Sequence, residues 1–191
     1  MAGLPQSEFS DYNKLFEINY DDLISRKKDG IHHSTKPIVG YKKIECMCDE
    51  NPWWAIFAKK KVECTSGVAT LEIPENSTIV RPLYIRNHGE GPISSPSNKL
   101  RTDNIIMQKY EPLSKVACKP WIEEQISMMW NRIYTISSNC YCYSIFQENY
   151  QYRENQNHKP KNELDLDLLQ ECAPGLHFFI EKEHAMNYRE I

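Results

Sequence analysis

The stretch ECAPGLHFFIEKEHAMNY, residues 171–188, decides the fold because it joins a turn, an apolar strand and a short amphipathic helix. Pro174-Gly175 predicts the turn, since proline fixes φ and glycine accepts positive φ. Residues 176–180 form a compact apolar run with one histidine, which predicts a mostly buried strand. The rest of the chain must therefore supply the strands that pair with it.

The residues of this strand have different expected roles. We expect Leu176, Phe178 and Ile180 to fill the core, and His177 to hydrogen-bond across the sheet rather than to act as a general base. Cys172 and His177 form a candidate nucleophile pair, but catalytic pairs normally meet across the fold. The local sequence also offers no positive neighbour to activate the thiol. We therefore predict no catalytic residue.

The composition limits the classes of protein. The chain has 191 residues and a formal net charge of −3, which argues against nucleic-acid binding. No apolar run approaches the ~20 residues that span a bilayer. The first residues lack the basic and apolar regions of a signal peptide. We expect no membrane span and a protein kept on the cytosolic side.

Seven cysteines are a high number for this length, and in a reducing compartment we expect thiols. Two C-x-C pairs, Cys46 with Cys48 and Cys140 with Cys142, offer four thiolates for zinc, although structural zinc sites usually space their ligands more widely. The alternative is that these cysteines act as small half-buried hydrophobic residues. Our prediction is that the protein holds no metal and no cofactor.

Apolar periodicity predicts the other elements. Helical spacing occurs over residues 8–26 and again over 120–134, where Pro120 suits a first turn. Alternating or β-branched runs predict strands, and clusters of Gly, Pro and Ser predict a turn at 64–67 and a loop at 87–98. The expected strands are 38–44, 54–62, 68–73, 78–86, 105–107 and 140–146.

The pattern predicts an α+β fold: a mostly antiparallel sheet, an N-terminal amphipathic helix and one further helix near 121–134. We divide the chain into a helical arm, residues 1–30, and a single α+β domain, residues 31–191. The arm is amphipathic and detachable, which is typical of a segment that docks on a partner.

Four segments together resemble a small uncharacterised domain of nucleocytoplasmic large DNA viruses. They are GYKK at 40–43, ATLEIPE at 69–75, ECAPGLHFF at 171–179 and EHAMNY at 183–188. The resemblance covers residues 38–188 and includes a C-terminal C-x-x-G-[IL]-H-F-F motif. This chain departs from the family by an insertion at 115–138 and by lacking the usual glycine near the aromatic strand. The resemblance implies a viral origin but no reaction.

A weaker resemblance is to ADP-ribosyltransferases, in which a G-I-Y-F strand and a following A-x-Y helix line the nicotinamide pocket. Residues 175–179 with Ala185 and Tyr188 are similar to that pattern. This resemblance implies a cleft between strands 38–44 and 176–180, faced by Tyr41, His177 and Tyr188. The catalytic glutamate of the transferases lies well beyond the motif, whereas this sequence stops at Ile191.

Together these observations predict a non-enzymatic structural or interaction protein of a large DNA virus. We expect it to be a minor capsid or virion component, with other viral proteins of the capsid or assembly as partners. The expected location is the virion or the host cytoplasm. The alternative is an ADP-ribosyltransferase-like nucleotide-binding domain, active or degenerate.

Overall fold

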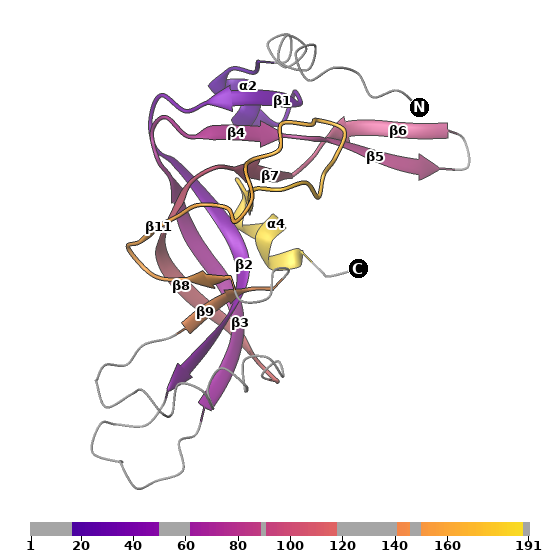
Figure 1. Cartoon of the computed structure of the whole chain (residues 1–191). Helices are drawn as coiled ribbons and strands as arrows, with labels where there is room; N and C mark the ends of the chain where they lie inside the picture. The colour runs from indigo at the N-terminus through magenta and orange to yellow at the C-terminus, as the bar shows by residue number, and fades with distance from the viewer. Residues whose placement is uncertain (1–16, 50–61, 89–90, 118–140, 146–149, 189–191) are drawn as a thin grey trace, which may run out of the picture.

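The long apolar and β-branched runs of the sequence form one large antiparallel sheet. The computed structural model describes residues 17–49, 62–88, 91–117, 141–145 and 150–188. Within these residues, ten strands share a sheet whose main order is β1-β4-β7-β12-β2-β3-β8-β11, with β9 pairing β2 and β10 pairing β9. Two further strands, β5 and β6, form a separate hairpin. Strand β12 lies between β7 and β2, so the stretch at 176–179 does occupy the middle of the sheet (Figure 1).

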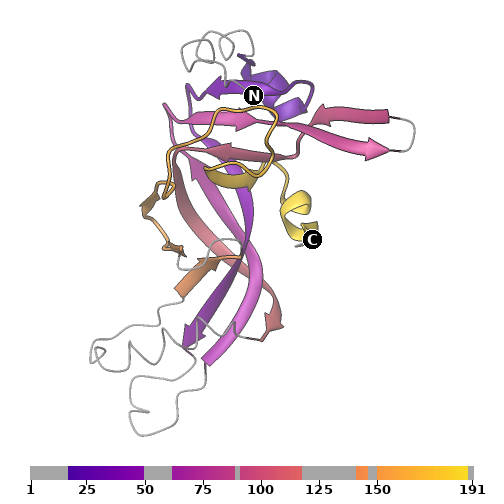
Figure 2. The same cartoon turned by 45° about the vertical axis from the view of Figure 1, so that its right-hand side comes forward.

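Three strands are much longer than the rest and curve together away from the other strands (Figure 1, Figure 2). They are β2, β3 and β8, each of twelve residues, whereas the β5–β6 hairpin projects from the other end of the molecule. The strand bounds are β1 Gly30–His33, β2 Ile38–Asp49, β3 Val62–Ile73, β4 Thr78–Arg81, β5 Leu83–His88, β6 Gly91–Pro96, β7 Lys99–Thr102, β8 Ile105–Val116, β9 Tyr141–Ser144, β10 Gln151–Tyr152, β11 Asn157–His158 and β12 Leu176–Phe179.

The main core lies on one face of the sheet. Leu176 and Phe178 of β12 are buried in it, as expected, and Ile180 is half-buried against it. Gly40 on β2 is needed here, because a Cβ at this position would lie 2.6 Å from the Phe178 ring. A smaller cluster of Val68, Phe179 and Ala185 lies under helix α4 (Lys182–Asn187). The C-terminal stretch therefore contributes to both clusters.

The expected α+β class is wrong, because the fold is mainly β. In the described part of the chain, helix is confined to α2 (Tyr20–Ser25) and α4, each of six residues. Asn19 caps α2 by accepting a hydrogen bond from the backbone N–H of Asp22, and Arg26 ends the helix in the left-handed conformation. The expected helix near 121–134, the strand at 54–61 and residues 1–16 lie outside the described residues.

The described part of the predicted arm packs on the sheet. Leu23 is fully buried in the main core, and its carbonyl accepts a hydrogen bond from the buried Arg81 guanidinium of β4. A bridge joins Glu17 to Ile31. The division of the chain at residue 30 stays a prediction.

Two irregular segments predicted from Gly, Pro and Ser are strands instead. Residues 64–67 lie inside β3, where Gly67 allows the backbone of β8 to come close: a Cβ there would lie 2.2 Å from the Glu111 carbonyl oxygen. Residues 91–96 form β6, which pairs with β5. At Gly67 the glycine permits close strand pairing, so a turn composition alone is misleading.

Candidate functional site

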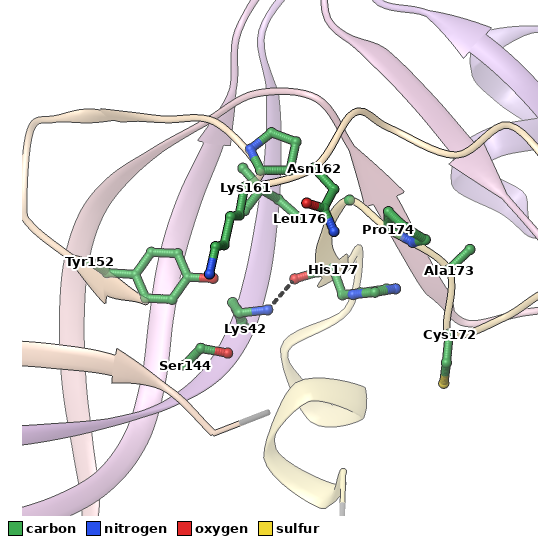
Figure 3. Close-up of a pocket in the computed structure, with 12 residues that line it drawn as sticks. Lys42, Ser144, Tyr152, Lys161, Asn162, Cys172, Ala173, Pro174, Leu176 and His177 are labelled. Atoms are coloured by element: carbon green, nitrogen blue, oxygen red, sulfur yellow. Dashed lines mark hydrogen bonds between the residues drawn. The ribbon is translucent and has the colours of Figure 1, made fainter. Parts of the chain in front are cut away.

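A cavity opens where two central strands diverge. Strands β12 and β2 pair only through Phe179 and Tyr41, and beyond that pair the strands separate. The cavity between them has a volume of about 310 Å³. Its lining includes Lys42, Ser144, Tyr152, Pro160, Lys161, Asn162 and the segment 172–177, and none of these described residues is an aspartate or glutamate. Figure 3 shows Lys42 between Tyr152 and Ser144 on one side and His177 with Cys172–Pro174 on the other.

Lys42 is the central group of the cavity. It projects from the face of β2 that also carries the buried residues Gly40 and Ile44, and it is 6% exposed. Its Nζ donates a hydrogen bond to the His177 carbonyl oxygen at 2.7 Å, across the gap between the strands (Figure 3). Among the described contacts no carboxylate pairs with this ammonium. Burial and then the charge of Lys99 lower the pKa of Lys42 to about 7.

His177 contributes a neutral imidazole. Burial, followed by the charges of Lys42, Lys99 and Arg101, lowers the pKa of His177 to about 3, against a backbone hydrogen bond with Glu171 that raises it. Its Nε2 is buried and has no hydrogen-bond partner in the described part of the structure. The expected hydrogen bond from this ring across the sheet is therefore absent there, and the backbone carbonyl makes the cross-strand contact with Lys42 instead. Three cations within reach of one ring give the cavity a positive potential.

Cys172 does have a positive neighbour, contrary to the sequence-based expectation. The Nζ of Lys99 on β7 lies 3.3 Å from the Cys172 sulfur and 3.0 Å from the Tyr188 hydroxyl. Although burial lowers the pKa of Lys99, its contacts with Tyr188 and Cys172 outweigh burial and raise it. Cys172 and His177, the candidate nucleophile pair that was set aside, both line the cavity, and no described hydrogen bond joins them.

Arg101 holds the chain segment that leads into the cavity wall. Its fully buried guanidinium donates hydrogen bonds to the carbonyl oxygens of Asp165, Asp167 and Gln170. The backbone of Asp165 in turn bonds the Pro174 carbonyl. The carboxylates of Asp165 and Asp167 accept from backbone N–H groups two residues later and thereby form turns. These carboxylates shape the loop and leave the cavity lining without negative charge.

The structure separates the three residues predicted to face a cleft. His177 lines the cavity, but Tyr41 and Tyr188 pack against the small cluster of Val68, Phe179 and Ala185 instead. The Tyr188 ring lies 5.2 Å from the Phe179 ring. Of the three residues predicted to face a cleft, His177 alone is in the lining of this cavity. Their role in ligand binding stays a prediction.

A disulfide fixes the side of the cavity opposite His177. Cys46 of β2 and Cys142 of β9 are directly paired across the sheet and joined by their sulfurs. The same strand β9 carries Ser144, and Tyr152 of β10 pairs with Cys142. Cys46 and Cys142 are therefore joined in a disulfide and are not the free thiols that we expected. As disulfide sulfurs, these two of the four candidate zinc ligands are not available to bind a metal. The Cys48 side chain and Cys140 lie outside the described residues, among which no group of three or more ligands could hold a metal ion.

Removing this disulfide should destabilise the protein. In the double variant C46S/C142S we expect the free energy of unfolding to fall by about 2–4 kcal/mol, because the link closes a long loop in the unfolded chain. The two cysteines are 96 residues apart. Urea unfolding of oxidised wild type and variant measures the difference. As a control, dithiothreitol should remove most of the difference between the two proteins, because both keep the disulfide of Cys64 and the wild type alone also has the Cys46–Cys142 link. Equal stability of both oxidised proteins would contradict the prediction.

Sequence reasoning overlooked the residues that give the cavity its charge. Lys42, Lys99 and Arg101 are all buried and lie on three different stretches of the chain. One signal was available for Lys42: it falls on the apolar face of a strand, two residues from Gly40 and from Ile44. A lysine at such a position is buried unless the strand lies at the surface. No local signal brings Lys99 to Cys172, since 73 residues separate them.

Comparison with known proteins gives the origin of the chain. Residues 28–185 match the family of unknown function DUF5758. The chain belongs to this family. Two uncharacterized proteins of Acanthamoeba polyphaga mimivirus are similar: L812 is 41% identical over 61 residues, and L223 is 24% identical over 169 residues. The first match covers 32% of this chain and 36% of the relative, and the second covers 86% and 92%.

These relatives confirm the expected origin in an uncharacterised domain of a giant virus. Both relatives are themselves uncharacterized, so no activity can be inferred from them for this member of the DUF5758 family. No solved structure gave a significant match. In the described residues no helix has the length and apolar character needed to cross a membrane. The similarity to ADP-ribosyltransferases and the role in the virus stay predictions.

Proposed function

We propose that this viral domain binds a small anionic molecule, bearing a phosphate or carboxylate group, in the cavity around Lys42. The observation that carries the proposal is the buried Lys42 ammonium, which faces a cavity whose described lining has no carboxylate. Burial of a charge is costly unless an opposite charge or several hydrogen bonds compensate it. One carbonyl contact and the face of the Tyr152 ring, whose centroid lies 5.8 Å from Nζ, do so only in part.

The surroundings favour an anion as the missing partner. Lys99 and Arg101 lie behind the cavity and add positive potential, as the depressed pKa of His177 indicates. Lys161 and Asn162 line the cavity from the loop after β11 and offer N–H donors. A volume of about 310 Å³ is at the lower end of the range for ligand pockets. The occupant is therefore a small molecule with one or two charged groups.

Inorganic phosphate and glycolate are the probes that test this proposal. A ligand at ten times its dissociation constant adds about 1.4 kcal/mol of stability, or roughly 3–5 °C in Tm for a chain of this size. We expect such a rise with at least one probe at pH 6.5, measured against sodium chloride of equal ionic strength. Lys42→Met should abolish the rise, and Lys43→Met, on the opposite face of β2, should keep it. No rise with either probe would contradict the proposal.

The affinity should depend on pH through Lys42. Only the ammonium form attracts the anion, and the pKa of Lys42 is lowered to about 7. Below pH 7 the site is charged, and above it each pH unit costs about tenfold in affinity. Calorimetric titration with glycolate should show a Kd that is nearly constant from pH 5.5 to 6.5 and about tenfold weaker at pH 8.5 than at pH 7.5. A Kd independent of pH would exclude Lys42 as the binding cation.

A second candidate function is assembly in the virus, favoured by the outer edge of β8. From Glu111 to Val116 the described pairing of β8 is with β3 alone, and Leu113 on this segment is 43% exposed. An open strand edge can add a strand from another chain. This supports a minor capsid or virion component that binds other viral proteins, located in the virion or the host cytoplasm. Mass spectrometry of purified virions tests it, since absence from the particle would exclude the virion role.

A further inference from the structure

The position of Lys42 suggests more than attraction of an anion. Its Nζ lies at the fork between β2 and β12, with one described hydrogen bond, and faces open cavity space (Figure 3). A permanently charged group would serve equally well for simple binding, and Arg81 and Arg101 show that this sheet can bury guanidinium groups. Each of those guanidiniums is instead bonded to two or more backbone carbonyls. The group left facing the cavity is the primary amine, which alone of these cations can act as a nucleophile.

We propose that Lys42 forms an imine with a small oxo acid, a compound that carries a carboxylate beside an aldehyde or ketone. This inference rests on the proposed function, and it names the chemical class of the ligand. The carboxylate is held by Lys161 and Asn162 at the cavity wall, and the carbonyl carbon lies at the Lys42 amine. The volume of about 310 Å³ is ample for both groups and several further carbon atoms.

The charged and titratable groups around Lys42 support this chemistry. His177 faces the cavity from β12, Tyr152 from β10 and Lys161 from the loop after β11, while Lys99 and Arg101 on β7 lie behind the lining and act through their charge. Burial and the charge of Lys99 lower the pKa of Lys42 to about 7, so about half of the molecules hold a neutral amine at pH 7. An ordinary exposed lysine is neutral in less than about 0.1% of molecules at this pH. No described carboxylate lies beside Lys42 to stabilise its ammonium form and raise its pKa again.

The step balances without an external oxidant or reductant. The neutral Lys42 nitrogen forms a bond to the carbonyl carbon, and the carbonyl oxygen takes a proton from water in the cavity. The nitrogen gives a proton to the hydroxide that remains, which leaves a neutral carbinolamine. The C–O bond then breaks, the oxygen takes a further proton from a cavity water and leaves as water, and the nitrogen lone pair forms the C=N bond of an iminium. The iminium nitrogen gives its remaining proton to the hydroxide left behind, so the imine forms with no net gain or loss of protons. The reaction converts an amine and a carbonyl compound into an imine and one water, and it is reversible.

Reductive trapping with glyoxylate tests the inference on the full-length, oxidised protein. Glyoxylate carries a carboxylate and an aldehyde, and sodium cyanoborohydride at pH 7 reduces its imine to a stable secondary amine. Peptide mapping by mass spectrometry then compares Lys42 with Lys43 in the same peptide. Lys43 lies on the opposite face of β2, where its Nζ bonds the Tyr188 carbonyl oxygen. We expect at least about tenfold more label on Lys42, in line with its larger neutral fraction, and protection of Lys42 by glycolate.

Separate outcomes test the two levels of the proposal. If glycolate binds but Lys42 is not labelled above Lys43, anion binding stands and the imine is excluded. If glycolate fails to bind and Lys42 is unlabelled, both fail. The variant Lys42→Arg has no primary amine at this position, so it should lose label at position 42 while the label on Lys43 stays as in the wild type. Because the comparison of Lys42 with Lys43 is made within the wild type, the test stays valid even if this variant does not fold.

Discussion

Replacement of Lys42 by methionine should raise the free energy of unfolding by about 3 kcal/mol at pH 6, in the absence of ligand. Methionine has a similar length and carries no charge to desolvate, and replacing buried ions by apolar groups is often stabilising. The pKa of Lys42 is lowered from 10.5 to about 7, chiefly by burial, which corresponds to a cost on the order of 4–5 kcal/mol when the ammonium is charged in the folded state. Loss of the bond to the His177 carbonyl offsets about 1 kcal/mol of this gain.

The gain should shrink as the pH rises. Above pH 7 the folded protein has lost the Lys42 proton, whereas the unfolded chain keeps it until about pH 10.4. The unfolded state therefore binds more protons in this window, and the stability of the wild type rises with pH. Below pH 7 both states are protonated and the full cost of burial is present. The variant lacks this group, so its advantage over the wild type is largest at low pH and nearly gone by pH 10.

Urea unfolding at pH 6, 8 and 9.5 measures this dependence. Lys109→Met is the matched control, because Lys109 is exposed on β8 and its replacement should change stability little and by the same amount at each pH. A stabilised protein that no longer responds to glycolate would indicate that Lys42 is kept for function at the expense of stability. If Lys42→Met is destabilising at pH 6, the ammonium has a compensating partner in the folded state, and the proposal that it binds an anion loses its support.

The strands could be predicted where the pattern is local. Alternating apolar residues at 69–73 and the apolar run at 176–180 correctly indicated β3 and β12, since each signal lies within a few residues. The β5–β6 hairpin could not be predicted in this way, because residues 87–98 are rich in glycine and proline and so resemble a loop in composition. The α+β prediction gave too much weight to helical spacing near the N-terminus, of which the described part forms only the six-residue α2.

The candidate site was harder to predict because its residues meet only through the topology. His177 was singled out from its apolar neighbours, and it does line the cavity. Its partner Lys42 lies 135 residues earlier, and the two meet because β12 joins the sheet beside β2. The same insertion places β12 against β7 and brings Lys99 and Arg101 to the cavity. A lysine on the buried face of a strand is the one local sign that the sequence carried.

The second large effect should come from Arg101, whose guanidinium lies buried among three backbone carbonyls. In Arg101→Ala these oxygens lose their donors, and each buried unpaired acceptor costs about 1–3 kcal/mol. We therefore expect the free energy of unfolding to fall by about 3–5 kcal/mol. Some of this loss should be local, because the loop at 165–170 is tied to the cavity wall through the Asp165–Pro174 backbone bond.

Hydrogen exchange separates the local effect from the global one. In Arg101→Ala, amides of residues 165–176 should exchange faster than in the wild type under conditions where the β2–β3 amides remain protected. Glycolate binding should also weaken, because residues 172–177 of this segment line the cavity. Arg101→Lys is the matched control: it keeps the charge but reaches fewer carbonyls, so it should lose about half as much stability and still fail to order the loop fully. If Arg101→Lys fully restores both stability and protection, charge alone suffices, and the fork of hydrogen bonds to the loop is not what holds the cavity wall in place.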